Sequence, residues 1–201
     1  MTGKSNKLSG VLGLILYPLL WVLLYYLMTL RFTFLVWIFL IPLFFFIKKF
    51  SYKQIVLFYG PIIISGSLWI FSWLKKYDPD IWISLSIIFG SYFIISGLIT
   101  KLLFDNIKNQ VALILIIPII WIGLALPYEA NVIGNFWLNF SMYQPTMAPL
   151  IWYLGGWGIT FFIIQFSYLL YLGVEKKWKN GKINLLVVAS FGAILFCNVF
   201  C

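Results

Sequence analysis

The chain has 201 residues, of which 63% are hydrophobic, 21% aromatic and only 9% charged. Soluble domains carry roughly 25% charged residues, and a chain of this size cannot bury so much apolar surface in water. The composition therefore excludes an ordinary soluble domain and predicts an integral membrane protein. Lys4 and Lys7 precede the first apolar run, but that run has the length of a membrane span and lacks the small-residue cleavage site of a signal peptide.

The few charged residues divide the chain into uncharged intervals, most of which have the length of one membrane-spanning helix, about 20 residues. The predicted fold class is all-α: a single transmembrane domain, residues 1–201, built as a polytopic membrane helix bundle of about seven transmembrane helices. In chain order, the predicted spans lie near residues 9–29, 32–48, 54–74, 81–103, 110–127, 149–173 and 183–200.

The uncharged interval 130–174 is too long for one helix. At about 1.5 Å per residue it would extend about 68 Å, more than twice the thickness of the hydrocarbon core. We therefore expect residues 128–148 to form an extra apolar connection on the outer face. Two arrangements of this connection stay open: a re-entrant element that dips into the bilayer, or an amphipathic linker that lies flat in the interface.

The distribution of basic residues predicts the orientation. With the N-terminus inside, the inner segments carry 11 basic residues and the outer segments carry 3. This bias favours a multi-pass protein of the cytoplasmic (inner) membrane, with its N-terminus inside and its C-terminus outside. The net charge of +9 is then mainly a topology signal and a match to anionic headgroups. No basic stripe alternates with exposed polar residues, so nucleic acid is not an expected partner.

Residues able to do chemistry are scarce. The chain has no His, which is the commonest general base and metal ligand. Cys197 and Cys201 are interpreted as apolar fillers or an incidental pair, because two thiols without a nearby carboxylate make a poor metal site. Asp78 and Asp80 flank Pro79 and indicate a solvated turn. We therefore predict no catalytic residue, no metal site and no cofactor in this chain.

The segment 134–162 combines features that a plain span or a surface loop does not share. It has no charged residue, it contains helix-breaking Gly and Pro residues, and its amide side chains include Asn139 and Gln144. On the outer face it can form a lid or re-entrant element over a lipid-filled cavity. Glu129, which opens the connection, is either a simple interfacial carboxylate or an acid with a function. Ordinary interfacial belts also explain the tryptophans at positions 69, 73, 121, 137, 152 and 157.

Four short stretches resemble one family, the bacterial apolipoprotein N-acyltransferases, in order and spacing. FWLNFSMYQ at 136–144 resembles the family's Phe-Pro-Trp…Gly-Tyr-Ser-Gln segment, and GGWGITFF at 155–162 resembles its Gly-x-Tyr-Gly-Leu-Ser-Phe-Leu stretch. IPIIW keeps a Pro…Trp pair that ends at Trp121, and SGSLW resembles a Gly-x-x-Trp that ends at Trp69. The resemblance covers roughly residues 30–200.

The resemblance implies only part of the family's activity. Ala125 stands where the family usually has Glu, and Phe136 replaces the motif Pro. The nitrilase-like domain that carries the family's Glu, Lys and Cys is absent from these residues, as is the family's final helix. What the resemblance implies here is the membrane half, which admits phospholipid and lipoprotein from the bilayer. The substrate-binding residues expected on this basis are Glu129, Trp137, Tyr143, Gln144, Trp69 and Trp157.

Two functions remain in competition. The first is the membrane domain of an apolipoprotein N-acyltransferase, completed by a nitrilase-like domain in a longer product or on a separate chain. The second is a stand-alone membrane protein that binds or moves a lipid or small apolar ligand without chemistry. Membrane phospholipid is the expected partner in both, and lipoproteins are added in the first.

Overall fold

The computed structural model describes residues 3–30, 32–128, 140 and 148–175. These residues are helical and contain no strand, which confirms the predicted all-α fold class. The helices are α1 (Gly3–Thr29), the 3-10 helix η1 (Thr33–Trp37), α2 (Ile41–Lys49), α3 (Tyr52–Gln54), the π-helix η2 (Ile55–Tyr59), α4 (Gly60–Ile70), the 3-10 helix η3 (Ser72–Lys76), α5 (Pro79–Asn106), α6 (Gln110–Tyr128) and α7 (Ala148–Val174).

Four helical segments in the described part of the chain are long and apolar enough to cross a membrane. They match the predicted spans near 54–74, 81–103, 110–127 and 149–173, and the protein is therefore a membrane-embedded helix bundle. Their observed bounds are Tyr52–Ile70, Pro79–Asn106, Gln110–Pro127 and Leu154–Val174.

The other three predicted spans have different outcomes. Residues 9–29 belong to α1, whose apolar part, Leu12–Met28, is shorter than the four segments above. Residues 32–48 are divided between η1 and α2, because Pro42 occupies the first turn of α2 and has no N–H to continue the preceding helix. Residues 183–200 lie outside the described residues.

Proline also explains the wide turn before α4. Pro61 lies in the first turn of α4, directly after the π-helix η2. A proline ring clashes with the carbonyl four residues earlier, here that of Leu57, in a regular α-helix. The π-helical turn moves that carbonyl away while keeping the chain helical through α3, η2 and α4.

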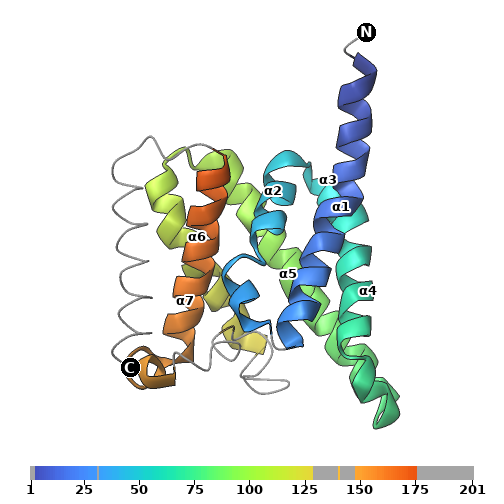
Figure 1. Ribbon diagram of the computed structural model, residues 1–201, viewed down its shortest axis with the longest axis vertical. Helices are drawn as coiled ribbons and strands as arrows, with labels where there is room; N and C mark the ends of the chain where they lie inside the picture. The colour runs from blue at the N-terminus through green and yellow to red at the C-terminus, as the bar shows by residue number, and fades with distance from the viewer. Residues whose placement is uncertain (1–2, 31, 129–139, 141–147, 176–201) are drawn as a thin grey trace.

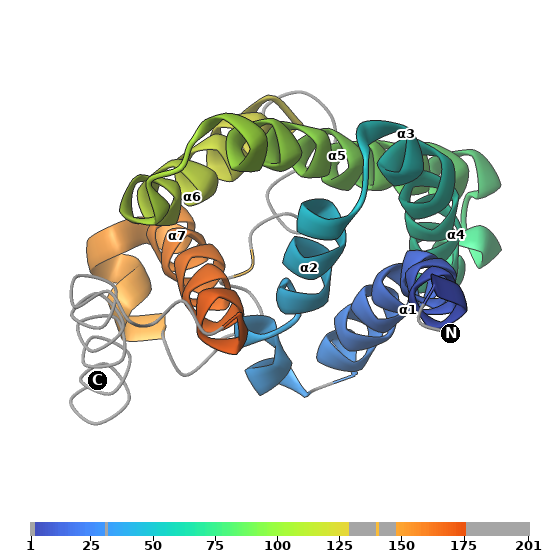
Figure 2. The same ribbon diagram turned by 90° about the horizontal axis from the view of Figure 1, so that it is seen from above.

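Successive helices run in alternating directions and enclose a central element. Viewed from above, α1, α4, α5, α6 and α7 form an arc around α2 (Figure 2). α5 packs against α4 and α6, α7 packs against α6, and α1 packs against α2. α2 is only nine residues long, but most of its side chains are buried, as its inner position requires.

The ends of the helices separate the basic residues into two groups. The N-terminus of α1, the C-terminus of α2 and the connection from α5 to α6 lie at one end of the bundle, and η3 lies at the other (Figure 1). Lys48 and Lys49 therefore lie at the end opposite Lys75 and Lys76. Successive loops of the described helices thus lie at alternating ends of the bundle, as expected for a chain that crosses a membrane repeatedly.

Aromatic rings dominate the core. The largest fully buried side chains among the described residues are all Trp, Tyr or Phe. At the end that carries Lys48, the ring of Phe104 stacks on Tyr168 at 5.8 Å and on Tyr171 at 6.2 Å. The Lys48 ammonium lies 5.4 Å from the Phe104 ring centre, and the Tyr168 hydroxyl donates to Gln110 Oε1 at 2.9 Å. These contacts join α2, α5, α6 and α7 at this end.

Candidate functional site

Two of the six residues expected to bind substrate lie in the described part of the chain, Trp69 in α4 and Trp157 in α7. The other four lie outside the described residues: Glu129, Trp137, Tyr143 and Gln144. α4 and α7 lie on opposite sides of the bundle (Figures 1 and 2). The structure therefore does not bring Trp69 and Trp157 together, and each has surroundings of its own.

Trp69 lines an open apolar groove of about 630 Å³ between α1 and α4. This volume is within the range of small-molecule sites, about 300–1,000 Å³. α1 lines one wall with five aliphatic side chains, several of them about half exposed. The complete lining is Leu16, Leu19, Leu20, Val22, Leu23, Pro61, Ile62, Ser65, Gly66 and Trp69. Such a lining suits an acyl chain and offers almost nothing to a charged group.

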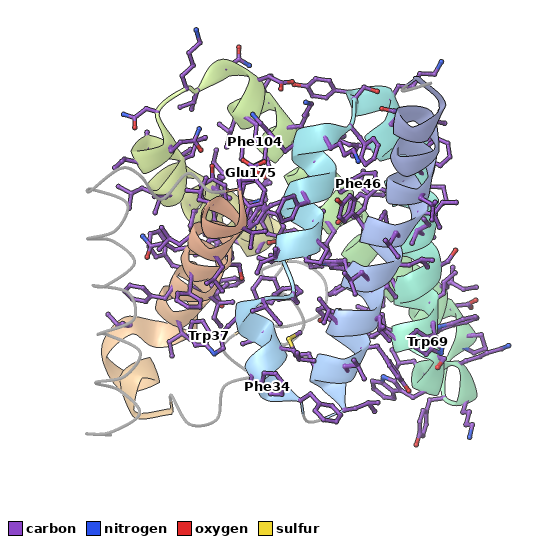
Figure 3. All side chains as sticks on the ribbon, turned by 45° about the horizontal axis from the view of Figure 1, so that its top comes forward. Phe34, Trp37, Phe46, Trp69, Phe104 and Glu175 are labelled. Atoms are coloured by element: carbon purple, nitrogen blue, oxygen red, sulfur yellow. The ribbon has the colours of Figure 1, made fainter. Side chains whose placement is uncertain are left out.

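Trp69 marks one end of this groove. Its indole stacks on the ring of Tyr26 from α1, with ring centres 4.0 Å apart and planes inclined by 28°. The side chain stays 47% exposed. Trp69 lies at the end of the bundle opposite Phe104 and Glu175 (Figure 3). An indole has an apolar ring and a polar N–H, so this position suits the boundary between acyl chains and headgroups.

A glycine permits the close approach of the two groove helices. A Cβ atom at Gly66 would lie only 2.7 Å from Val22 Cγ2 and 2.8 Å from Val22 Cγ1. A larger residue there would therefore separate α4 from α1. On its other side α4 is held by α5, because the Trp82 indole N–H donates to the carbonyl of Leu68 at 2.8 Å. Contacts with α1 and α5 on its two sides thus hold α4 in position as one wall of the groove.

Phe140, a described residue between α6 and α7, lies in the core. Phe140 is fully buried. Its ring packs edge-on against Phe39 at 4.9 Å and is stacked with Phe93 of α5 at 6.4 Å. Phe93 in turn contacts Trp21 of α1 at 4.6 Å and Trp121 of α6 at 5.9 Å. Phe140 therefore joins the aromatic cluster that links α1, α5 and α6.

Trp157 follows a sharp kink in α7. Gly155 has φ 67° and ψ 166°, a backbone conformation that is almost exclusive to glycine. The part of α7 before the kink runs across the end of the part that follows (Figure 1). A Cβ atom at Gly158 would lie 2.7 Å from Leu154 Cβ, so the kink requires a glycine there too. Beyond it, Trp157 is half-buried against the core.

Several polar groups of the core form hydrogen bonds that join α5 to α6. The Tyr92 hydroxyl donates to the carbonyl of Trp121 at 3.1 Å, and the Trp121 indole N–H donates to Thr100 Oγ1 at 2.9 Å. The Thr100 hydroxyl donates to the carbonyl of Ser96 at 2.7 Å. These bonds tie α6 to α5 through satisfied polar groups. They explain why Trp121 is buried and is not an interfacial tryptophan.

None of the acidic residues that the structure describes lines the groove. Asp78 accepts hydrogen bonds from the backbone N–H groups of Asp80 and Ile81 and caps α5, in line with the predicted turn. Asp105 pairs with Lys101 at 3.0 Å. Within the described ranges, no group of three or more His, Cys, Asp or Glu side chains could hold a metal ion.

Sequence reasoning missed three features of this site: the Tyr26 partner of Trp69, the Gly66–Val22 contact and the burial of Phe140. Tyr26 and Val22 carry no local signal, because both contacts join α1 to a helix about 40 residues later. Phe140 lies inside the stretch 136–144, but the resemblance there rests on Trp137 and Gln144 and predicts nothing about Phe140.

Compared with known proteins, the chain matches no family model, no curated protein and no solved structure.

Proposed function

We propose that this chain is the membrane domain of an apolipoprotein N-acyltransferase-like protein, which admits phospholipid and lipoprotein from the bilayer. Acyl transfer itself would belong to a nitrilase-like domain, in a longer product or on a separate chain. The observation that carries the proposal is the apolar groove between α1 and α4, with Trp69 at its end.

The groove has the shape and chemistry for an acyl chain. It lies between two apolar helices and its leucines are about half exposed, so in a bilayer these leucines would face lipid tails. Its side chains are aliphatic except for Ser65 and Trp69. The tail of a phospholipid would lie along the α1 leucines, and the Trp69–Tyr26 pair would lie near the headgroup.

The proposal includes the finer topology predicted from the charges. In this topology the chain crosses the cytoplasmic membrane about seven times, with its N-terminus on the inner side and its C-terminus on the outer side. The opposite placement of Lys48 and Lys49 relative to Lys75 and Lys76 supports the alternation of loops between the two ends, whereas the orientation itself rests on the count of basic residues. Most of the connection 128–148 lies outside the described residues, so its two predicted arrangements both stay predictions.

Two of the motif stretches on which the proposal draws have local structural roles. The glycines of GGWGITFF coincide with the kink in α7, since Gly155 has a glycine-specific backbone conformation and Gly158 has no room for a Cβ atom. Phe140 of FWLNFSMYQ belongs to the central aromatic cluster. Both stretches thus have local structural reasons for their composition. Trp137, Tyr143, Gln144 and Glu129 stay proposed residues of the lipid-facing mouth. Trp69 is a proposed lipid contact at the groove, and Trp157 is a separate proposed contact on the other side of the bundle.

The second candidate is a stand-alone protein that binds or moves a lipid without chemistry. The same groove favours it, because α1 and α4 form the groove without a contribution from any further domain. The two candidates differ in the presence of a nitrilase-like domain or partner, and agree on the groove.

A photoreactive phospholipid tests the groove directly. After cross-linking in vesicles, we expect labelled peptides to contain residues 16–23 and 61–69. Ser65→Trp fills the groove and should reduce this labelling several-fold. The matched control is Ile119→Trp, because Ile119 is 59% exposed on α6, away from the groove. Equal labelling of the exposed faces of α5 and α6, unchanged by Ser65→Trp, would contradict the proposal.

A further inference from the structure

Two polar side chains meet in the aromatic core. Trp21 of α1 and Tyr59 of the π-helix η2 are both fully buried. Their rings pack edge to face, with centres 6.4 Å apart. Neither the Trp21 indole N–H nor the Tyr59 hydroxyl has a hydrogen-bond partner among the described residues. It is unusual for two rings in contact each to carry an unbonded polar group, because buried polar groups are nearly always hydrogen-bonded.

Other polar groups of this core are bonded. The Trp121 indole N–H, which is equally buried, donates to Thr100 Oγ1, and the Tyr92 hydroxyl donates to a backbone carbonyl. A buried donor without an acceptor costs free energy, and the cost is high where no water is nearby. Replacement of the two polar side chains by Phe would avoid this cost while keeping aromatic packing. The presence of both polar groups therefore points to a partner that bonds them.

The surroundings define what that partner can be. Trp21 also contacts Phe39 and Phe93, the two rings that pack against Phe140. Tyr59 lies beside α5, since a Cβ atom at Gly97 would be 3.7 Å from Tyr59 Cε1. Ser96, the residue before Gly97, also has a buried hydroxyl oxygen without a described partner.

We propose that Trp21 and Tyr59 form a buried polar site that binds one neutral oxygen acceptor. An indole N–H can only donate, whereas a phenol hydroxyl can donate or accept. A water molecule or an ester carbonyl oxygen can receive the indole N–H and also bond the hydroxyl. A charged ligand is unsuitable, because the adjoining rings offer no counter-charge in an apolar core. The π-helical turn that ends at Tyr59 is a type of irregularity common at functional sites.

This inference does not depend on the acyltransferase proposal, because it follows from the core alone. The oxygen can come from water or from a lipid ester. Water would be a permanent part of the bundle. A lipid ester would occupy the site only when phospholipid is present.

The test measures hydrogen bonding of the Trp21 indole by ultraviolet resonance Raman spectroscopy of the full chain. The spectrum of Trp21→Phe is subtracted from that of the unaltered protein, which isolates the N–H marker band of Trp21. The same subtraction with Trp121→Phe gives the band of a bonded indole, since Trp121 donates to Thr100 Oγ1. We expect the Trp21 band at the bonded position. A bonded band in phospholipid-free detergent assigns the oxygen to water, and a bonded band found only in phospholipid nanodiscs assigns it to a lipid ester.

Two results would overturn the proposal. One is a Trp21 band at the unbonded position in both detergent and nanodiscs. The other is a bonded band that Asn139→Ala abolishes, since the acceptor would then be a protein amide from outside the described residues.

A second variant keeps the test decisive if Trp21→Phe does not fold. Tyr59→Phe removes only the hydroxyl group. We expect it to lower the melting temperature, whereas Tyr77→Phe, at a position 82% exposed, should leave that temperature unchanged. An unchanged or raised melting temperature in Tyr59→Phe would show that the hydroxyl bonds nothing.

Discussion

The contact between Gly66 and Val22 determines how closely α1 and α4 approach. In Gly66→Ala the added methyl group would lie 2.7 and 2.8 Å from the two Val22 methyl carbons, well inside van der Waals contact. Val22 cannot easily rotate away, because a β-branched side chain in a helix has one strongly preferred rotamer. The variant must therefore push the helices apart or strain the valine.

The magnitude follows from two opposing effects. Overpacking of this kind costs about 1–3 kcal/mol. Replacement of Gly by Ala within a helix returns up to about 1 kcal/mol. Because contacts of 2.7 and 2.8 Å are very short, the cost should lie in the upper part of its range, and we expect a net loss of about 1–2 kcal/mol in the free energy of unfolding. For a chain of this size, 1 kcal/mol corresponds to about 2–4 °C in the melting temperature.

The assay is thermal unfolding of the purified protein in detergent micelles, followed by tryptophan fluorescence. Gly123→Ala is the matched control, because a Cβ atom at Gly123 would meet nothing within 4 Å. That control should melt at or above the temperature of the unaltered protein. The double variant Val22→Ala/Gly66→Ala should be more stable than the sum of the single effects predicts, since the smaller valine replacement makes room. Strict additivity, or a Gly66→Ala variant as stable as the control, would refute the reasoning.

Three further substitutions test the core, the kink and the cap. Phe140→Ala leaves a cavity between Phe39 and Phe93 and should cost about 3–5 kcal/mol, measured as a fall in melting temperature. Gly155→Ala forces a side chain into a glycine-specific backbone conformation and should cost about 1–3 kcal/mol in the same assay. Asp78→Ala removes the acceptor for two N–H groups at the start of α5 and should cost about 0.5–2 kcal/mol, whereas Asp78→Asn should retain most of the stability.

Each of these expectations has a clear contrary result. A Phe140→Ala variant with unchanged melting would mean that this ring does not belong to the core. A fully stable Gly155→Ala variant would mean that α7 continues without the kink. Equal losses in the Ala and Asn variants of Asp78 would mean that the side chain acts through its charge and not as a hydrogen-bond acceptor.

The positions of several helices were predictable from charge alone, but their ends were not. The span predicted near 81–103 is the helix Pro79–Asn106. Charged residues mark where the hydrocarbon region ends, whereas the backbone stays hydrogen-bonded into the headgroup region. Lys101 and Asp105 form an ion pair on the last turns of α5 and so extend the helix beyond its apolar part.

The interior features depend on contacts that a linear pattern does not contain. The apolar run at 32–48 predicted one span, but Pro42 divides it, and its second half becomes the buried element α2. The groove needs α1 and α4 side by side, and nothing in either stretch specifies the other as its neighbour. The Trp69 position was predicted as a lipid contact on the basis of a motif, whereas its partner Tyr26 required the packed structure.

Of the predicted site, the structure describes Trp69 and Trp157 and separates them. From the sequence, each tryptophan could be explained as a residue of the membrane interface or as a substrate-binding residue, and no feature of its own segment distinguishes the two roles. Their surroundings now distinguish them: Trp69 is exposed beside a groove, and Trp157 packs against the core after a kink. A tryptophan's role thus depends on the neighbouring helix more than on its own segment.

The most direct test of the proposed function is the native mass of this protein and its associated chains, extracted from its own membranes without stringent washing. We predict a nitrilase-like domain, seen as a polypeptide far heavier than 23.4 kDa or as a second chain in equal amount. A species of 23.4 kDa without a second chain would contradict the N-acyltransferase account and leave a lipid-binding protein without that chemistry.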